Sequence, residues 1–209
     1  MSEEREVKIA APASFALPDF DGVVPGLRAV DRGRHQLDAT YWDSATLALH
    51  GAGFGLRYRT TDGAAGHWTL KAQSHRDGPA VVREEIDMDG EPGSPPARAL
   101  AAVQAAAGGD ELRPVAKLRT SRRTVDLVDA EGRRRAEIAD DTVSVRADTR
   151  EVSAFHEVEV EIIGDPDDTM VDAVLARLRD AGAVDIDPTS KYVRALRALG
   201  YSLPHTELP

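Results

Sequence analysis

The chain of 209 residues contains no cysteine, which excludes disulfide bonds and thiolate metal ligands. This absence fits a reducing compartment and predicts a cytoplasmic location. No apolar run approaches the roughly 20 residues needed to span a bilayer. The acidic start of the chain also lacks the pattern of a secretory signal. We therefore expect a protein with no membrane partner.

An excess of positive charge is also missing. The 36 Asp and Glu residues outnumber the 26 Lys and Arg residues, which gives a net charge of -10. Such a balance argues against a surface for non-specific binding of nucleic acid, so no nucleic-acid partner is expected. Net charge describes the external field, however, and does not exclude a locally basic pocket. The positions of the basic residues therefore decide what the protein can bind.

Much of the sequence alternates between apolar and charged residues with a period of two, which is typical of β-strands. The segments predicted as strands are residues 4–9, 26–31, 36–42, 54–60, 67–73, 81–88, 113–128, 133–140, 142–147 and 154–163. We expect 26–31 and 36–42 to form a hairpin around Arg32-Gly33-Arg34. Helices are predicted at residues 44–50, 96–107, 166–181 and 191–199. Many strands and few helices indicate a mainly β fold of the α+β class, closed into a barrel that leaves no exposed edge.

Charged residues recur at positions i and i+2 within these strands, so they share one face about 6.6 Å apart. The groups with this spacing are Glu4/Glu6 with Lys8, Arg57/Arg59, Arg83/Glu85, Lys117/Arg119 and Glu157/Glu159/Glu161, and Glu137/Asp141, four residues apart, fits less cleanly. A half-exposed sheet would also alternate in this way. An ordinary solvated face would, however, include Thr, Ser and Gln, whereas these positions are almost uniformly Arg, Lys or Glu. The joint pattern therefore favours a functional charged face.

The two signs of charge are segregated along the chain. Acidic residues concentrate in the first strand and near residues 157–161, and basic residues concentrate in the middle strands. Carboxylate clusters bind hard cations such as Mg²⁺ and Mn²⁺. Pairs of arginines bind phosphate oxygens through two parallel hydrogen bonds. A hydrolase acting on a phosphate chain needs both kinds of group.

Eight motifs follow one another in an order that resembles a known family. They are Glu4-Arg5-Glu6-Val7-Lys8, Tyr41-Trp42-Asp43-Ser44, Leu56-Arg57-Tyr58-Arg59, Trp68-Thr69-Leu70-Lys71, Arg83-Glu84-Glu85, Lys117-Leu118-Arg119, Glu157-Val158-Glu159-Val160-Glu161 and Ser190-Lys191-Tyr192. Together they resemble the CYTH domain, or triphosphate tunnel metalloenzyme, family, and within it the bacterial inorganic triphosphatases. The resemblance implies an eight-stranded antiparallel tunnel with flanking helices over residues 1–200, followed by a linker-like tail at 201–209.

The resemblance also assigns roles to the charged residues. Triphosphate or a short polyphosphate would be held by Lys8, Arg57, Arg59, Lys71, Arg83, Lys117, Arg119 and Lys191. One or two Mg²⁺ or Mn²⁺ ions would be held by Glu4, Glu6, Glu157 and Glu159, helped by Glu137 or, as second choice, Asp141. The catalytic set would be Glu4, Glu6, Lys8, Glu157 and Glu159.

The implied activity is metal-dependent hydrolysis of a triphosphate, foremost inorganic triphosphate, to pyrophosphate and phosphate. Thiamine triphosphatase and adenylate cyclase are alternatives within the family, although no purine pocket is evident in the sequence. A non-catalytic polyphosphate-binding module is the alternative from another class. Many bacterial relatives carry a helical CHAD domain after the CYTH domain, which raises the possibility of such a partner domain in a longer parent chain.

Overall fold

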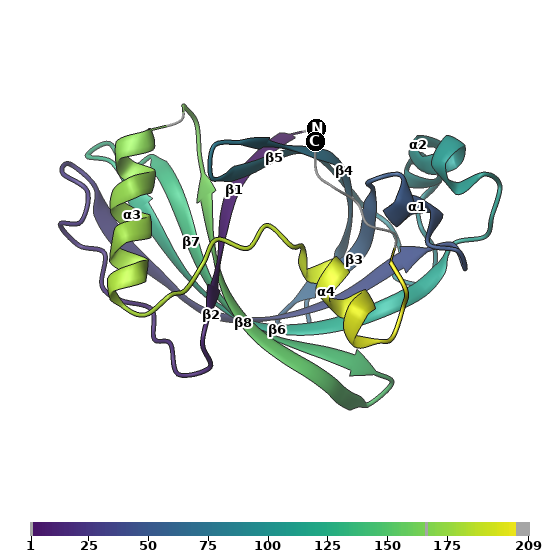
Figure 1. Ribbon diagram of the computed structural model, residues 1–209. Helices are drawn as coiled ribbons and strands as arrows, with labels where there is room; N and C mark the ends of the chain where they lie inside the picture. Colours follow the sequence, from purple (N-terminus) through teal and green to yellow (C-terminus); the bar gives the residue numbers. More distant parts are fainter. Residues whose placement is uncertain (1, 166, 204–209) are drawn as a thin grey trace.

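The computed structural model describes residues 2–165 and 167–203, and its eight strands close into one antiparallel barrel (Figure 1). The strands are β1 (Ser2–Ala11), β2 (Arg28–Asp43), β3 (Gly55–Thr61), β4 (His67–Asp77), β5 (Ala80–Met88), β6 (Arg113–Val128), β7 (Arg134–Ala147) and β8 (Arg150–Ile162). Their order around the barrel is β1-β5-β4-β3-β2-β6-β7-β8, with β8 closing on β1. The predicted closed barrel is confirmed.

Two pairs of predicted segments are single strands in the structure. The predicted hairpin around Arg32-Gly33-Arg34 is wrong, because β2 runs through this point while paired with β6. The chain absorbs the irregularity as a shift in register between Asp31 and Gly33, and Gly33 adopts a φ of 87° that favours glycine. Likewise, predicted segments 133–140 and 142–147 form the continuous strand β7. Turn residues alone therefore did not distinguish a turn from a bulge.

Four helices accompany the barrel: α1 (Ala48–Gly51), α2 (Ala97–Ala107), α3 (Asp168–Asp180) and α4 (Lys191–Ala198). Side chains cap two of them, since Asp167 accepts a hydrogen bond from Met170 N at 3.1 Å and Ser190 accepts one from Val193 N at 3.2 Å. The predicted start of α3 at residue 166 lies outside the described residues. No helix in the described part of the chain is long and apolar enough to cross a membrane.

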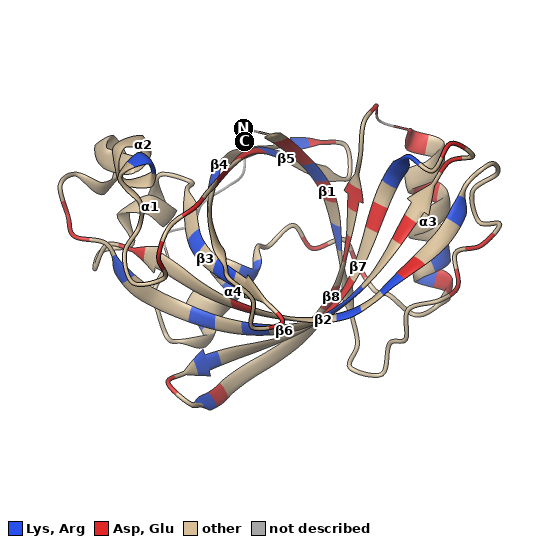
Figure 2. Cartoon of the chain, turned by 180° about the vertical axis from the view of Figure 1, so that it is seen from behind, with Lys and Arg blue, Asp and Glu red and all other residues tan. Residues whose placement is uncertain are grey.

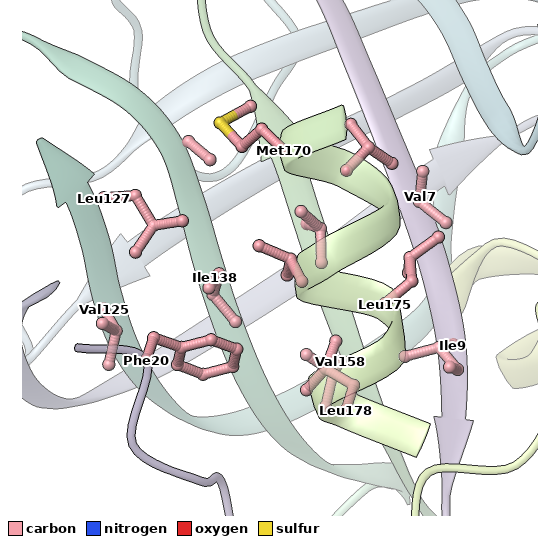
Figure 3. Close-up of a cluster of buried hydrophobic side chains, with 14 of the residues drawn as sticks. Val7, Ile9, Phe20, Val125, Leu127, Ile138, Val158, Met170, Leu175 and Leu178 are labelled. Carbon is pink, nitrogen blue, oxygen red and sulfur yellow. The ribbon is translucent and has the colours of Figure 1, made fainter. Parts of the chain in front are cut away.

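The apolar face of the barrel is its outer face. Figure 3 shows α3 packed on β1 and its neighbours, with Leu178 and Met170 near Val7, Ile138 and Val158. A second cluster joins α2 to the outer faces of β3 and β4 through Val103, Leu56 and Trp68. Because helices cover the apolar positions from outside, the alternate positions of the same strands point into the barrel. This arrangement places most of the charged i, i+2 residues in the interior.

Helix α4 packs against the inner face at one end of the barrel. Tyr192 and Leu196 join a cluster with Leu118 of β6 and Val143 of β7, so the inward positions at this end are apolar. Tyr201 and Leu203, at the start of the predicted tail, pack partly buried against the same cluster. The remainder of that tail, from residue 204 onward, lies outside the described residues.

Candidate active site inside the barrel

A cavity of about 890 Å³ lies inside the barrel, and strands, α1 and the start of α4 line it. Among the described residues, nine Lys and Arg side chains and two Glu side chains line the cavity. This balance is opposite to the net charge of -10 of the whole chain. Figure 2 shows charged residues of both signs along the strands around the central opening. The interior therefore attracts anions, although the exterior is acidic on average.

Three carboxylates converge at one side of this cavity. Asp141 of β7 and Glu157 and Glu159 of β8 each offer an oxygen atom, and these atoms lie within 4.8 Å of one another. Lys191 Nζ, at the start of α4, lies 2.9 Å from Asp141, 2.5 Å from Glu157 and 2.7 Å from Glu159. The three acids thus already surround one positive charge, the ammonium group of Lys191.

Charge pairing favours the ionised forms of Glu159 and Asp141 despite their burial. Burial alone would raise the pKa of Glu159, but Lys191, Lys8 and Arg122 outweigh it and hold that pKa well below its usual range. The pKa of Asp141 is lowered in the same way, since Lys191 and Arg122 overcome the effect of burial. Three carboxyl groups whose oxygen atoms lie this close together fit a hard cation such as Mg²⁺ or Mn²⁺. The donor chemistry of this cluster therefore suits a divalent metal ion.

The acids of β1 are engaged in separate ion pairs. Glu6 is 2% exposed and pairs with Lys8 at 2.9 Å and with Arg83. Glu4 pairs with Lys71 at 2.9 Å and with Arg83 at 3.2 Å. Although burial opposes it, Lys71 leads the interactions that hold the pKa of Glu4 well below its usual range. Lys8 also lies 3.3 Å from Glu159, so this lysine connects the acids of β1 to the three-carboxylate cluster.

Arg57 and Arg59 of β3 line the cavity without an ion-pair partner in the described part of the chain. The Nε atom of each is buried and makes no hydrogen bond to the described residues. The positive charge of Arg57, followed by burial, lowers the pKa of Arg59 to about 10. Two crowded guanidinium groups with unused donors form a strong site for a polyanion.

The CYTH domain family matches residues 2–195, which is nearly the whole chain. The chain belongs to the CYTH domain family. An uncharacterized protein of Mycobacterium tuberculosis is 30% identical over 213 residues, which cover 93% of this chain and 40% of that protein. The chain therefore spans less than half the length of this curated relative.

Solved structures share the fold of this CYTH domain. A Hippeastrum protein, described as a candidate adenylyl cyclase with a dominant triphosphatase activity, has a TM-score of 0.61 at 18% identity. That comparison covers 96% of this chain and 98% of the other. A Bacillus halodurans protein, described as a candidate adenylate cyclase, has a TM-score of 0.60 at 16% identity, with 93% and 98% covered. These likenesses establish the architecture.

The cavity of the CYTH domain brings most of the predicted basic residues together. The predicted residues that line it are Lys8, Arg57, Arg59, Lys71, Arg83 and Lys191. The inward placement expected for Lys117 and Arg119 is wrong, because both are exposed and Arg119 pairs with Asp38 at 2.8 Å on the surface. The residue between them, Leu118, points inward instead and packs beneath α4. At this end of β6 the inner face is apolar and the outer face is charged. The sequence pattern therefore suggested the opposite assignment of the two faces.

Arg122 is the basic residue of β6 that faces the cavity, and sequence reasoning missed it. It donates hydrogen bonds to Asp141 at 2.8 and 2.6 Å and to Glu159 at 2.6 Å. Arg122 shares its face with Leu118 and Thr120, so the period of two along β6 was the available signal. Arg123 obscured this signal. Two consecutive arginines interrupt the alternation of charged and apolar residues, although their side chains point to opposite faces of the strand.

Glu137 lies apart from the three-carboxylate cluster. It pairs with Arg134 at 2.9 Å in a second cleft of about 460 Å³, which Asp126 and Arg32 also line. The geometry therefore favours Asp141 over Glu137 as a metal ligand. Glu161 lies two residues after Glu159 on the same face of β8. Burial, followed by the charges of Glu4 and Glu137, raises its pKa to about 7.

Proposed function

We propose that this CYTH domain hydrolyses a triphosphate, with inorganic triphosphate preferred, to pyrophosphate and phosphate in the presence of Mg²⁺ or Mn²⁺. One observation carries the proposal. Arg57 and Arg59, with their unpaired guanidinium groups, line the same interior cavity as Lys191 and Glu159, a member of the three-carboxylate cluster. Such a site offers phosphate-binding donors and metal-binding oxygens within one enclosed space.

The basic residues bind and orient the substrate. Arg57 and Arg59 would take the phosphate oxygens first, because no carboxylate in the described part of the chain competes for their donors. Lys8, Lys71 and Arg83 would turn from their carboxylate partners toward the phosphate chain as its charge arrives. The proposed catalytic set, Glu4, Glu6, Lys8, Glu157 and Glu159, would act on the phosphate chain from the paired strands β1 and β8.

The acidic residues would hold the metal. Asp141, Glu157 and Glu159 are the ligands supported by their spacing, with Glu4 and Glu6 contributing from β1. A divalent cation bound there would neutralise charge on phosphate oxygens and acidify an attacking water molecule. Lys191 would then release the carboxylates and pair with the phosphate chain, since its flexible stem carries a mobile point charge.

The buried acids favour hydrolysis over simple binding. Glu157 is 1% exposed and Asp141 is 0% exposed, and burying such carboxylates is costly unless a cation offsets the lost hydration. A module that only bound polyphosphate would gain affinity by replacing them with neutral residues, because they repel the anion. The presence of these buried acids therefore supports catalysis.

The test is phosphate release from inorganic triphosphate, ATP and thiamine triphosphate at matched concentrations, with Mg²⁺, with Mn²⁺ and with a chelator. We expect inorganic triphosphate to turn over fastest and the chelator to abolish turnover. Faster turnover of ATP, or formation of cyclic AMP with pyrophosphate, would refute the substrate assignment. Tight binding of all three compounds with no hydrolysis would instead identify a binding module.

A further inference from the structure

Arg194 of α4 is a cation beside the three-carboxylate cluster to which the proposed function gives no role. It follows Lys191 by three residues, so the two side chains lie on the same side of the helix. Both approach Glu157 of β8, since Lys191 Nζ lies 2.5 Å from Oε1 and Arg194 Nε lies 3.7 Å from Oε2. Each oxygen of this carboxylate therefore faces a different cation of α4.

The two cations differ in their access to the cavity. Lys191 lines the interior cavity, whereas Arg194 and Glu157 are not among the described residues that line it. Lys191 Nζ also lies 2.9 Å from Asp141 and 2.7 Å from Glu159, so it occupies the centre of the three-carboxylate cluster. A metal ion that enters this cluster from the cavity would therefore displace Lys191 and not Arg194.

Two contacts hold the guanidinium group of Arg194 in place. Its Nη2 atom donates a hydrogen bond to Asp187 at 2.5 Å, and its Cζ atom lies 4.8 Å from the ring centroid of Phe155. Phe155 precedes Glu157 by two residues on β8 and shares its face. Asp187 is itself tied to β1, because its backbone N–H group donates to the carbonyl oxygen of Lys8 at 3.0 Å. Arg194 is thus fixed on several sides.

The facing atoms of Arg194 and Glu157 both lack a hydrogen bond. Nε of Arg194 and Oε2 of Glu157 are buried, and neither has a hydrogen-bond partner among the described residues. Their separation of 3.7 Å is slightly longer than a hydrogen bond. Glu157 is 1% exposed, and buried polar atoms without partners are costly. A small shift of the carboxylate toward Arg194 would satisfy both atoms.

We propose that Arg194 is a positioning residue for the metal site, which holds Oε2 of Glu157 and thereby leaves Oε1 available to a divalent cation. Carboxylates that bind metal ions are commonly oriented by such hydrogen-bonding neighbours. The inference rests on the proposed function only in placing a divalent cation at the three-carboxylate cluster. Arg194 itself would touch neither the cation nor the phosphate chain.

Calorimetric titration with Mn²⁺ alone, without any phosphate compound, tests this role. Arg194→Met, which keeps an apolar stem against Phe155, should weaken Mn²⁺ binding about 10-fold, as expected when a neighbour that orients a metal ligand is removed. Electrostatics alone predicts the opposite, because the substitution removes a positive charge that repels the metal ion. The sign of the change therefore separates positioning from simple repulsion.

Two further variants of arginines complete the comparison. Arg194→Lys keeps a charged donor near Glu157 but lacks the fork that binds two acids, so it should recover part of the lost affinity. Arg179→Gln, which changes an exposed arginine of α3, is the control and should bind Mn²⁺ as the parent does. Near-ultraviolet circular dichroism checks that each variant retains its packed core.

Asp187→Asn tests the same role without changing Arg194. It removes the charge that anchors the guanidinium group, so Mn²⁺ binding should weaken in the same direction. Added to Arg194→Met it should have little further effect, because both substitutions act on Glu157 through one series of contacts. This variant decides the question if Arg194→Met fails to fold.

Hydrolysis of inorganic triphosphate at saturating Mn²⁺ gives an independent readout. Arg194→Met should lower kcat about 10-fold and leave KM nearly unchanged, because Arg194 does not line the cavity. Unchanged or tighter Mn²⁺ binding by folded Arg194→Met, or by Asp187→Asn if the former does not fold, would overturn the positioning role and leave the metal site intact. A parent protein that binds no Mn²⁺ would overturn both.

Discussion

Glu161 is a carboxyl group inside the barrel that has no cationic partner within 4 Å in the described part of the chain. Its Cα lies opposite those of Glu6 and Glu137 on the neighbouring strands, so acidic residues flank it on both sides. Burial, followed by the negative charges of Glu4 and Glu137, raises its pKa from 4.5 to about 7. Like charges crowded in this way favour the protonated form.

This shift predicts a dependence of stability on pH. A carboxyl whose pKa is higher in the folded state contributes stability at low pH, and that contribution is lost as the pH rises from about 4.5 through about 7. Glu161→Gln should therefore unfold at higher urea concentration than the parent above pH 7, by on the order of 1–2 kcal/mol after allowance for solvent screening. Near pH 4 the two proteins should be similar. A Gln variant that is less stable than the parent at pH 8 would contradict the assignment.

Single positions also show what a sequence can predict about the site. Alternation placed Glu6 and Arg57 on the face opposite the apolar residues of their strands, and the family resemblance predicted that this charged face points inward. The same reasoning placed Lys117 and Arg119 wrongly, because Leu118 packs under α4 and reverses the usual rule at that end of β6. The tertiary structure determines which face of a strand a helix covers, and the sequence of that strand alone does not show it.

At the level of elements, Asp43 links the end of β2 to both α1 and α4. Its carboxylate accepts three backbone N–H bonds, from Ser44, Leu49 and His50, and one hydroxyl bond from Tyr192. Asp43 binds the backbone of the short helix α1, but its contact with Tyr192 spans 149 residues and was not predicted from the sequence. Such long-range pairs leave no periodic signal in the sequence.

The link predicts a stability effect for a single hydroxyl. Tyr192→Phe should lower the free energy of unfolding by about 1.5–3 kcal/mol, the usual range for a hydrogen bond to a charged group. Tyr201→Phe is the matched control, since the Tyr201 hydroxyl makes no hydrogen bond to the described residues. Urea unfolding of both variants measures the difference. Equal effects of the two substitutions would show that the bond to Asp43 contributes nothing.

At the level of elements, the sequence predicted most strands and all four helices to within a few residues. Residues 113–128 were predicted correctly as one strand, and the helices ending at Ala107 and near Leu199 lie where expected. The hairpin predicted at Arg32-Gly33-Arg34 failed because glycine permits both a turn and a bulge. In the structure β2 pairs with β6 on both sides of Gly33, so the chain forms a bulge there and not a turn. The local sequence around Gly33 does not show which strand it will pair with.

For the whole molecule, closure of the barrel is what gathers the charged residues into one enclosed space. The helices α2 and α3 cover the apolar outer face, so the inner face can carry charge (Figure 1). Inside a closed barrel each interaction is stronger than on a surface, because bulk water is excluded. The same charged residues on an open sheet would be screened and would hold neither metal nor phosphate tightly.

The central claim is that acids hold the metal and bases hold the phosphate within this enclosed site. Two double variants separate these roles: Glu157→Gln/Glu159→Gln removes negative charge, and Arg57→Ala/Arg59→Ala removes the unpaired donors. Glu84→Gln is a control for the loss of an exposed acid.

Calorimetric titration of these proteins with triphosphate, with and without Mn²⁺, tests the claim most directly. The Gln variant should lose Mn²⁺ binding yet bind triphosphate as tightly as the parent or more tightly, because repulsion of the anion has been reduced. The Ala variant should lose triphosphate affinity by about 2–5 kcal/mol. If instead the Gln variant binds Mn²⁺ as the parent does, or the Ala variant binds triphosphate unchanged, the division of the site into acidic metal ligands and basic phosphate ligands is wrong.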